Sequence, residues 1–474
     1  MAGRFSKGET KIRPGVYFNA TSETSLELSG AIDGVVAVAF KANFGPLNQV
    51  VNLTSYAQIA DIFGDDSIAG SNTKLLEEIF IGGAATVKAV RVGNGGTKAM
   101  ITLKDTTNET PVEVAVIAQK YAGTRALSIT IKDSLAIATK RECIIYSGTK
   151  ELMKVTFDKG TNEVDSLVEA INNYEGGIVD ATKLAAGNGT LAALTQTAFT
   201  TAGASPTVTN ADYSNAFELL EAETFNVLCI DSNDAQLHAL AKAFIERAYD
   251  AGLLAQLVIG EPTSVTLTTR KANAAAKNSQ QVVYVGNGFV YNNEDIEGYL
   301  AAGYAAGVIA ATPANKAITH VTVNNATDLV GALTNTQIEE CLQSGMLIFT
   351  KSTRGYVQFE QGINTLISLT DDQDAGWKKI RRTKTRYELI DRVNRNTESL
   401  IGQLNNDQNG QQTLIMICNA VIKDMVAENK LISGTVSLDS TTPAAGDYAY
   451  FIISVYDLDS LEKVYFTYTF HYSE

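Results

Sequence analysis

Residues 345–395 of this 474-residue chain are GMLIFTKSTRGYVQFEQGINTLISLTDDQDAGWKKIRRTKTRYELIDRVNR, and the fold assignment starts from them. Two apolar runs, at 346–349 and 356–360, flank a polar turn, which predicts a β-hairpin. The single tryptophan, Trp377, then begins a segment with eight Lys or Arg residues and two acids. In a protein of net charge −14, this segment indicates either a surface for an acidic partner or the solvated face of a basic helix.

The composition is that of a soluble globular protein, with 45% apolar and 19% charged residues. This length predicts two to four domains. The start, MAGRFSKGETKIRPG, lacks an apolar region, so no secretory signal is predicted. The most apolar helical run, at residues 299–312, is too short to span a bilayer. The excess of acids argues against nucleic acid as the main partner.

The sequence predicts no cofactor and no metal. Four cysteines lie far apart, which indicates buried thiols in a reducing compartment rather than disulfides or a metal site. No histidines or cysteines have metal-ligand spacing. Glycine-rich turns after two strands complete neither G-x-G-x-x-G nor a Walker A pattern, so no phosphate site is expected.

Two parts of the chain have an α/β pattern. In residues 31–92, strands at 35–40 and 86–92 flank two short helices. The second part has a strand at 226–230, a helix capped by residues 231–234 and a strand at 253–259. This order predicts a right-handed parallel β-α-β unit.

Residues 93–206 show a different composition, with short alternating segments separated by turn residues. This pattern predicts a small β-sandwich or barrel with one helix at 164–172 and a loose exit at 181–204. The strands are expected at 100–103, 112–118, 127–131, 142–146 and 152–157.

The C-terminal part is predicted to contain a long helix at 411–429, followed by strands at 434–438, 448–456 and 461–472. The last two are expected to form a hairpin. A strand that ends at a chain terminus exposes an unpaired edge unless another strand covers it.

Several segments carry a resemblance to a known family. EQGINTLISLT at 360–370, WKKIR at 377–381 and IGQLNN at 401–406 resemble the C-terminal domain of contractile phage-tail sheath proteins, which also occur in R-type bacteriocins and related contractile injection systems. RPGVY at 13–17 and the segment at 207–231 resemble other parts of the same family.

The resemblance implies a discontinuous, subtilisin-like α/β core with an inserted small β-sandwich or barrel domain, an α+β C-terminal domain and extended terminal arms. The expected divisions are an N-terminal arm at 1–20, core at 21–96, an inserted β-rich outer domain at 97–206, core at 207–344, and a C-terminal sheath domain at 345–474 whose terminal hairpin and arm begin at about 435.

The resemblance also implies a structural role rather than an enzymatic one. Such a subunit polymerises as stacked hexameric rings around an inner tail tube protein and contracts to drive the tube through a target cell envelope. Its expected partners are copies of itself, the tube protein, and baseplate and tail terminator proteins, with no nucleic acid and no membrane insertion. The particle, a phage tail or a bacteriocin, is expected to assemble in the bacterial host cytoplasm.

We expect the two chain ends to link neighbouring subunits by adding strands to a neighbour's sheet. The residues expected to exchange are Ile12, Arg13, Pro14, Gly15, Val16, Tyr17 and Phe18 at one end, and Val464, Tyr465, Phe466, Thr467, Tyr468, Thr469 and Phe470 at the other. A frayed terminus is the alternative for the first set. The candidates for contact with the inner tube are Lys378, Lys379, Arg381, Arg382, Lys423, Asp424, Glu428 and Lys430.

An α/β hydrolase-like enzyme with accessory β domains is the alternative function. Asp231 follows a strand, as a catalytic aspartate would, and His238 lies on the next helix. No serine has the sequence context of a nucleophile, so we interpret Asp231 as a helix cap. A surface-array protein would fit the β-rich segment but would need a signal peptide.

Overall fold

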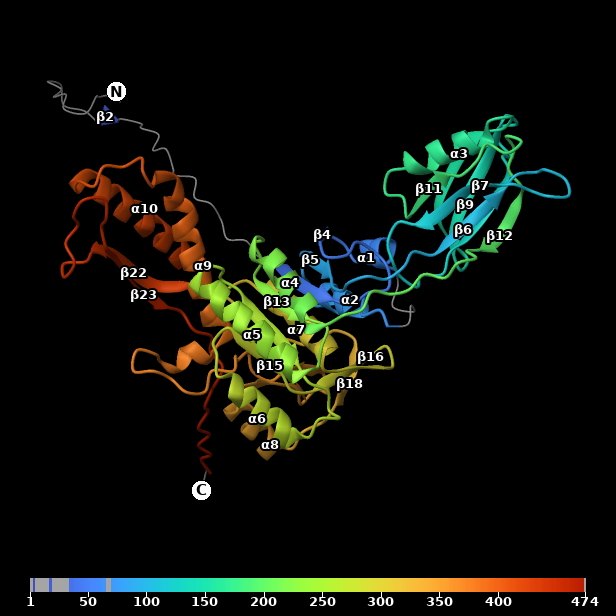
Figure 1. Ribbon diagram of the computed structural model, residues 1–474. Helices are drawn as coiled ribbons and strands as arrows, with labels where there is room; N and C mark the ends of the chain where they lie inside the picture. Colours follow the sequence, from blue (N-terminus) through green and yellow to red (C-terminus); the bar gives the residue numbers. More distant parts are fainter. Residues whose placement is uncertain (1–2, 5–16, 19–33, 65–69, 473–474) are drawn as a thin grey trace.

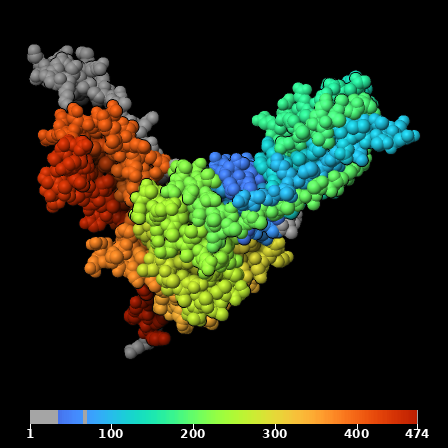
Figure 2. All heavy atoms as spheres, in the orientation of Figure 1, coloured from blue at the N-terminus to red at the C-terminus, as the bar shows by residue number. Residues whose placement is uncertain are grey.

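The computed structural model describes residues 3–4, 17–18, 34–64 and 70–472. Figure 1 shows a central α/β body with two lobes on opposite sides. One lobe is β-rich and the other contains α9, α10, β22 and β23. Figure 2 shows a broad concave surface between the two lobes.

A seven-stranded sheet forms the central body, in the order β19-β15-β14-β13-β3-β5-β4, and only β4 is antiparallel to its neighbour. Most of its strands are continuous buried apolar runs, as expected for a parallel sheet covered on both faces. The strands are β3 (Val35–Phe40), β4 (Val50–Leu53), β5 (Thr86–Arg91), β13 (Val227–Ile230), β14 (Gln256–Gly260), β15 (Val282–Val285) and β19 (Met346–Leu347). The predicted parallel β-α-β unit is confirmed.

Helices cover both faces of this sheet and bury two separate apolar clusters. One face carries α1 (Ala57–Phe63), α2 (Lys74–Ile81) and α7 (Tyr299–Ala311); the other carries α4 (Asn210–Glu221), α5 (Ala235–Asp250), α6 (Leu267–Lys277) and α8 (Asn335–Gln343). Helix α7 consists largely of small residues because it packs closely on α2. A Cβ on Gly307 would collide with the backbone of Ile79.

The β-rich lobe consists of two antiparallel sheets and one helix around a common core. The sheets are β11-β7-β6 and β10-β9-β8-β12. Their elements are β6 (Met100–Lys104), β7 (Glu113–Gln119), β8 (Ser128–Asp133), β9 (Lys140–Ser147), β10 (Lys150–Asp158), α3 (Glu163–Asn172), β11 (Val179–Lys183) and β12 (Leu194–Ala198). The strands predicted here are confirmed. The prediction of a loose exit at 181–204 was wrong, because β11 and β12 pair with β7 and β8.

The remaining elements extend the central body and build the second lobe. They are the sheet β17-β16-β18 (Glu294–Ile296, Gly288–Tyr291, Ala326–Val330), the hairpin β20 (Phe349–Lys351) and β21 (Val357–Phe359), the 3-10 helices η1 (Ala375–Lys378) and η2 (Glu398–Leu400), α9 (Ile380–Thr397), α10 (Gln408–Ala427), β22 (Leu431–Leu438) and β23 (Phe451–Asp457). The hairpin predicted in the opening stretch is confirmed, although residues 346–347 join the central sheet instead.

The predicted terminal hairpin was wrong. Strand β23 pairs with β22, with Leu438 opposite Phe451 and Leu431 opposite Asp457. This pairing turns Val455 toward α10, where it packs on the apolar cluster of that helix. Within the described chain, residues 461–472 pair with no strand.

Across the described ranges, no helix is both long and apolar enough to span a membrane. The predicted division into domains, including its limits at 96 and 206, and the likeness of the core to subtilisin stay predictions.

Candidate assembly surfaces

Residues 463–472, here called the C-terminal arm, leave the second lobe as an extended segment (Figure 1). Phe466 is 74% exposed and Phe470 is 80% exposed. Among the described residues, none forms a backbone ladder with this arm. An extended segment with free backbone groups and exposed aromatic rings is suited to strand addition on another chain.

The N-terminal strand-exchange candidates are only partly described. Ile12, Arg13, Pro14, Gly15 and Val16 lie outside the described residues. Tyr17 and Phe18 form β2, which runs parallel to β1 (Gly3–Arg4). Exchange by this end therefore stays a prediction.

The sheet of β22 and β23 has an exposed apolar face that the sequence did not reveal. One face packs on α10, and the other exposes Ile432, Ile452 and Tyr456, which is 69% exposed. Within the described part of the chain this sheet has only two strands, so both outer edges are open. The alternation of apolar and polar residues predicted both strands. It did not predict that they pair with each other, because the second strand was expected to form a hairpin with the arm.

The basic run that begins at Trp377 is largely neutralised within the subunit. Arg382 Nε donates to Asp457 Oδ2 at 2.6 Å, and Lys379 Nζ donates to Asp459 Oδ2 at 2.7 Å. Lys378 Nζ donates to the carbonyl of Ile367 at 2.9 Å. Arg381 is 6% exposed. This part of the chain is therefore neither a free cationic patch nor a solvated helix face.

The four tube-contact candidates near the end of α10 differ in their surroundings. Lys430 is buried, and its Nζ lies 2.6 Å from Glu428, which also binds Arg392 at 2.7 Å. Burial disfavours the charge of Glu428, but the hydrogen bonds from Arg392 and Lys430 outweigh it and lower the pKa of this carboxyl. Lys423 and Asp424 are exposed.

Asp231 does not cap helix α5, so that prediction was wrong. The cap is Asp234, whose Oδ1 accepts from the backbone N–H of Gln236 at 2.8 Å. Asp231 is buried after β13, and its two oxygens accept from Lys41 N at 2.7 Å, Asn72 Nδ2 at 2.6 Å and the hydroxyl of Tyr213. This burial raises the pKa of Asp231. Its carboxylate ties three segments together, which is a structural task.

His238 is fully buried, and its Nε2 lies 2.8 Å from the carbonyl oxygen of Ser232. Burial lowers the pKa of the imidazole. Both oxygens of Asp231 are bonded to other groups, so the geometry of an Asp-His pair for general base catalysis is not assembled.

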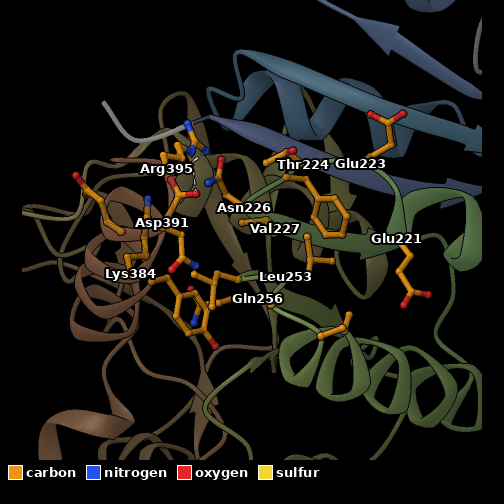
Figure 3. A pocket seen from close by; sticks show the side chains of 18 of the residues that line it. Glu221, Glu223, Thr224, Asn226, Val227, Leu253, Gln256, Lys384, Asp391 and Arg395 are labelled. Atoms are coloured by element: carbon orange, nitrogen blue, oxygen red, sulfur yellow. Dashed lines mark hydrogen bonds and ion pairs between the residues drawn. The ribbon is translucent and has the colours of Figure 1, made fainter. Parts of the chain in front are cut away.

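A pocket of about 350 Å³ lies between α9 and the core (Figure 3). Lys384, Asp391 and Arg395 face it from α9, and Glu221 and Glu223 lie on the opposite side. Asn226 and Gln256 place it at the amino ends of β13 and β14. Ligands of open α/β sheets bind at the carboxyl ends, so this pocket lies at the wrong edge for such an enzyme. Among the described residues, no group of three His, Cys, Asp or Glu side chains is placed to hold a metal ion.

Residues 207–365 match the family model described as phage tail sheath protein central domain. These residues form a phage tail sheath domain. The match confirms the resemblance drawn from the sequence, and it includes both the segment at 207–231 and residues 361–365.

Known proteins are similar to this chain over most of its length. The phage-like element PBSX protein XkdK of Bacillus subtilis is 25% identical, over 83% of this chain and 80% of that protein. The crystal structure of a sheath tail protein from Desulfitobacterium hafniense superimposes with a TM-score of 0.67 at 22% identity, over 94% of this chain and 100% of that one. The helical sheath of the anti-feeding prophage in its contracted state gives a TM-score of 0.55 at 11% identity, over 97% and 99%.

Proposed function

We propose that this chain is the structural subunit of a contractile tail sheath. The sheath domain at 207–365 carries the proposal, and the sheath-like fold over nearly the whole chain supports it. In this role the subunit polymerises as stacked hexameric rings around an inner tube and contracts to drive the tube through a target cell envelope. The particle is a phage tail or a related contractile injection system, assembled in the bacterial host cytoplasm.

The proposed link between subunits is strand exchange. The C-terminal arm of one subunit adds to an open edge of the β22–β23 sheet of the next, and residues 12–18 make the second link. The exposed aromatic side chains of the arm would then pack on the exposed apolar face of the receiving sheet. Because the linked segments are extended connections, two subunits can rotate relative to each other without losing their backbone bonds.

Contact with the inner tube must be reversible, because the sheath has to release the tube when it contracts. Exposed ion pairs contribute only about 0–1 kcal/mol each, which suits this requirement. Lys423 and Asp424 are the exposed candidates, so we assign them to the tube contact. The other candidates are bonded within the subunit or buried, so we assign them to the body of the lobe.

The work of contraction comes from subunit contacts that form in the shorter state. The remaining partners are baseplate and tail terminator proteins. Both follow from the proposed role.

Expression of the full chain, followed by negative-stain microscopy and sedimentation, tests this function. We expect tubes with a regular axial repeat. Purely monomeric protein at high concentration, together with a hydrolase activity that disappears in His238→Ala, would contradict it and favour the enzyme.

A further inference from the structure

Residues 457–462, here called the anchor segment, join β23 to the C-terminal arm and are tied to the body at several points. Arg382 Nε donates to Asp457, and Lys379 Nζ lies 2.7 Å from Asp459 Oδ2. The backbone N–H of Leu458 donates to the carbonyl of Lys430 at 3.1 Å. The chain is therefore bonded to the body at Asp457, Leu458 and Asp459, shortly before the free arm begins.

Glu462 is the last tied residue, and it contacts three separate elements. Thr319 Oγ1 donates to Glu462 Oε1 at 3.0 Å, Gln361 Nε2 donates to Oε2 at 3.0 Å, and Lys379 Nζ lies 3.3 Å from Oε2. The Glu462 side chain is 9% exposed, whereas Val464, in the adjoining arm, is 54% exposed. Burial disfavours the charge of Glu462, but these polar contacts outweigh it and lower the pKa of its carboxyl.

The segment at 361–365, part of the EQGINTLISLT motif at 360–370, connects Glu462 to the core. Gly362 N donates to Thr319 Oγ1 at 3.0 Å, so both residues belong to the same contact group as Glu462. Asn364 Nδ2 donates to the carbonyl of Trp377 at 2.8 Å, in the 3-10 helix η1 that precedes α9. Thr365 N donates to Val282 of the central sheet at 2.8 Å. A continuous set of contacts thus runs from Glu462, at the end of the anchor segment, to the central sheet.

We propose that Glu462 is the positioning residue that anchors the C-terminal arm. Gln361, Thr319 and Lys379 hold it, so the arm pivots at Lys463, and a pull on the donated strand passes through residues 361–365 into the central sheet. This inference rests on the proposed strand exchange for its purpose, but the anchor itself is a property of a single subunit.

Limited chymotrypsin digestion of the isolated full chain, followed by mass spectrometry, tests the anchor. In the wild type we expect the first cuts inside the arm, after Tyr465, Phe466 and Tyr468. In Glu462→Ala the segment before it is released, so cleavage after Leu461 and Leu458 should be at least tenfold faster. Lys463→Ala, one residue further along and without any role in the anchor, should keep the wild-type pattern.

The same digestion pattern in Glu462→Ala as in Lys463→Ala would overturn the proposal. Thermal unfolding shows whether Glu462→Ala retains the fold. If it does not, Gln361→Ala and Thr319→Val each remove one contact, and each must speed cleavage after Leu461 severalfold for the proposal to stand.

Assembled sheaths separate this proposal from the proposed function. Glu462→Ala keeps the whole arm, so we expect sheaths that form but break into short pieces on contraction, whereas Lys463→Ala sheaths stay intact. Intact Glu462→Ala sheaths would overturn force transfer through this residue. If a chain truncated after Glu462 still forms sheaths of normal length, strand exchange by this end fails, and the digestion result still decides whether the anchor exists.

Discussion

Proline substitutions in the C-terminal arm test strand exchange without disturbing the folded body. Thr467 and Tyr468 are exposed, and their backbone N–H groups bond to no described residue in the isolated subunit. Alternate residues of a strand direct their N–H groups to opposite edges, so one of the two faces the receiving strand. Thr467→Pro and Tyr468→Pro should each leave the free energy of unfolding of the isolated subunit within about 0.5 kcal/mol of the wild type.

The expected effect on assembly is large. A strand at 464–470 paired along one edge makes roughly six backbone bonds, each contributing about 1 kcal/mol net. Loss of the whole arm therefore weakens each link by about 6 kcal/mol, or roughly 10⁴-fold. A single proline on the paired edge leaves a buried carbonyl unsatisfied, which costs about 1–3 kcal/mol, or roughly 5- to 150-fold in the association constant.

Sedimentation velocity across a concentration series measures this effect, with sheath length in micrographs as the second readout. Thr467→Ala and Tyr468→Ala are the controls, because alanine keeps the N–H group. If the arm pairs along one edge, one proline variant should associate roughly 5- to 150-fold more weakly than its alanine control, while the other should resemble its control. If both proline variants assemble as well as the wild type, the strand-exchange argument is refuted.

Three further predictions concern the folded body and are measured by urea or thermal unfolding. Asp231→Ala should cost about 3 kcal/mol or more, because three donors lose their acceptor, whereas Asp234→Ala should cost about 1 kcal/mol for a lost helix cap; equal costs would contradict these roles. Glu388→Ala should cost about 1–3 kcal/mol, because buried Lys430 loses one of its two carboxylate partners and keeps only Glu428; a neutral result would contradict a stabilising role for Glu388. Burial raises the pKa of Glu78 from 4.5 to about 7, so the folded state binds more protons than the unfolded state between these values, and stability falls as pH rises through this window. Glu78→Gln cannot lose this proton. Between pH 4 and pH 8 its free energy of unfolding should therefore rise relative to that of the wild type by up to about 3 kcal/mol. An equal pH dependence of the two proteins would contradict this prediction.

The α/β body was predictable from local patterns. Strand β3 and helix α7 were placed to within a residue, because a continuous apolar run and a run of small residues each have few other structures available. Sequence patterns are sufficient to predict an element where burial on both of its faces determines its structure.

The pairing of the terminal strands was not predictable from the same patterns. The arm and β23 both alternate apolar and polar residues, and a short acidic turn joins them, so a hairpin was the simplest expectation. Strand β22 takes β23 instead because α10 supplies an apolar surface for both. Under the proposed function, the arm alternates apolar and polar residues because it pairs as a strand with another subunit.

The charged candidates for tube contact show a second limit of prediction from the sequence. The sequence around Lys379 and Arg382 predicted a free basic surface, because their partners Asp459 and Asp457 lie far along the chain. Likewise, the groups that bind Asp231 come from Lys41, Asn72 and Tyr213, which no local pattern relates to it. Only the fold brings these groups together.

An electron cryo-microscopy map of the assembled particle would show directly whether the C-terminal arm pairs with a neighbouring subunit. We expect residues 464–470 to form a strand with backbone hydrogen bonds to β22 or β23 of that neighbour. Density in which this segment folds back on its own subunit, with the edges of the β22–β23 sheet open to solvent, would contradict it.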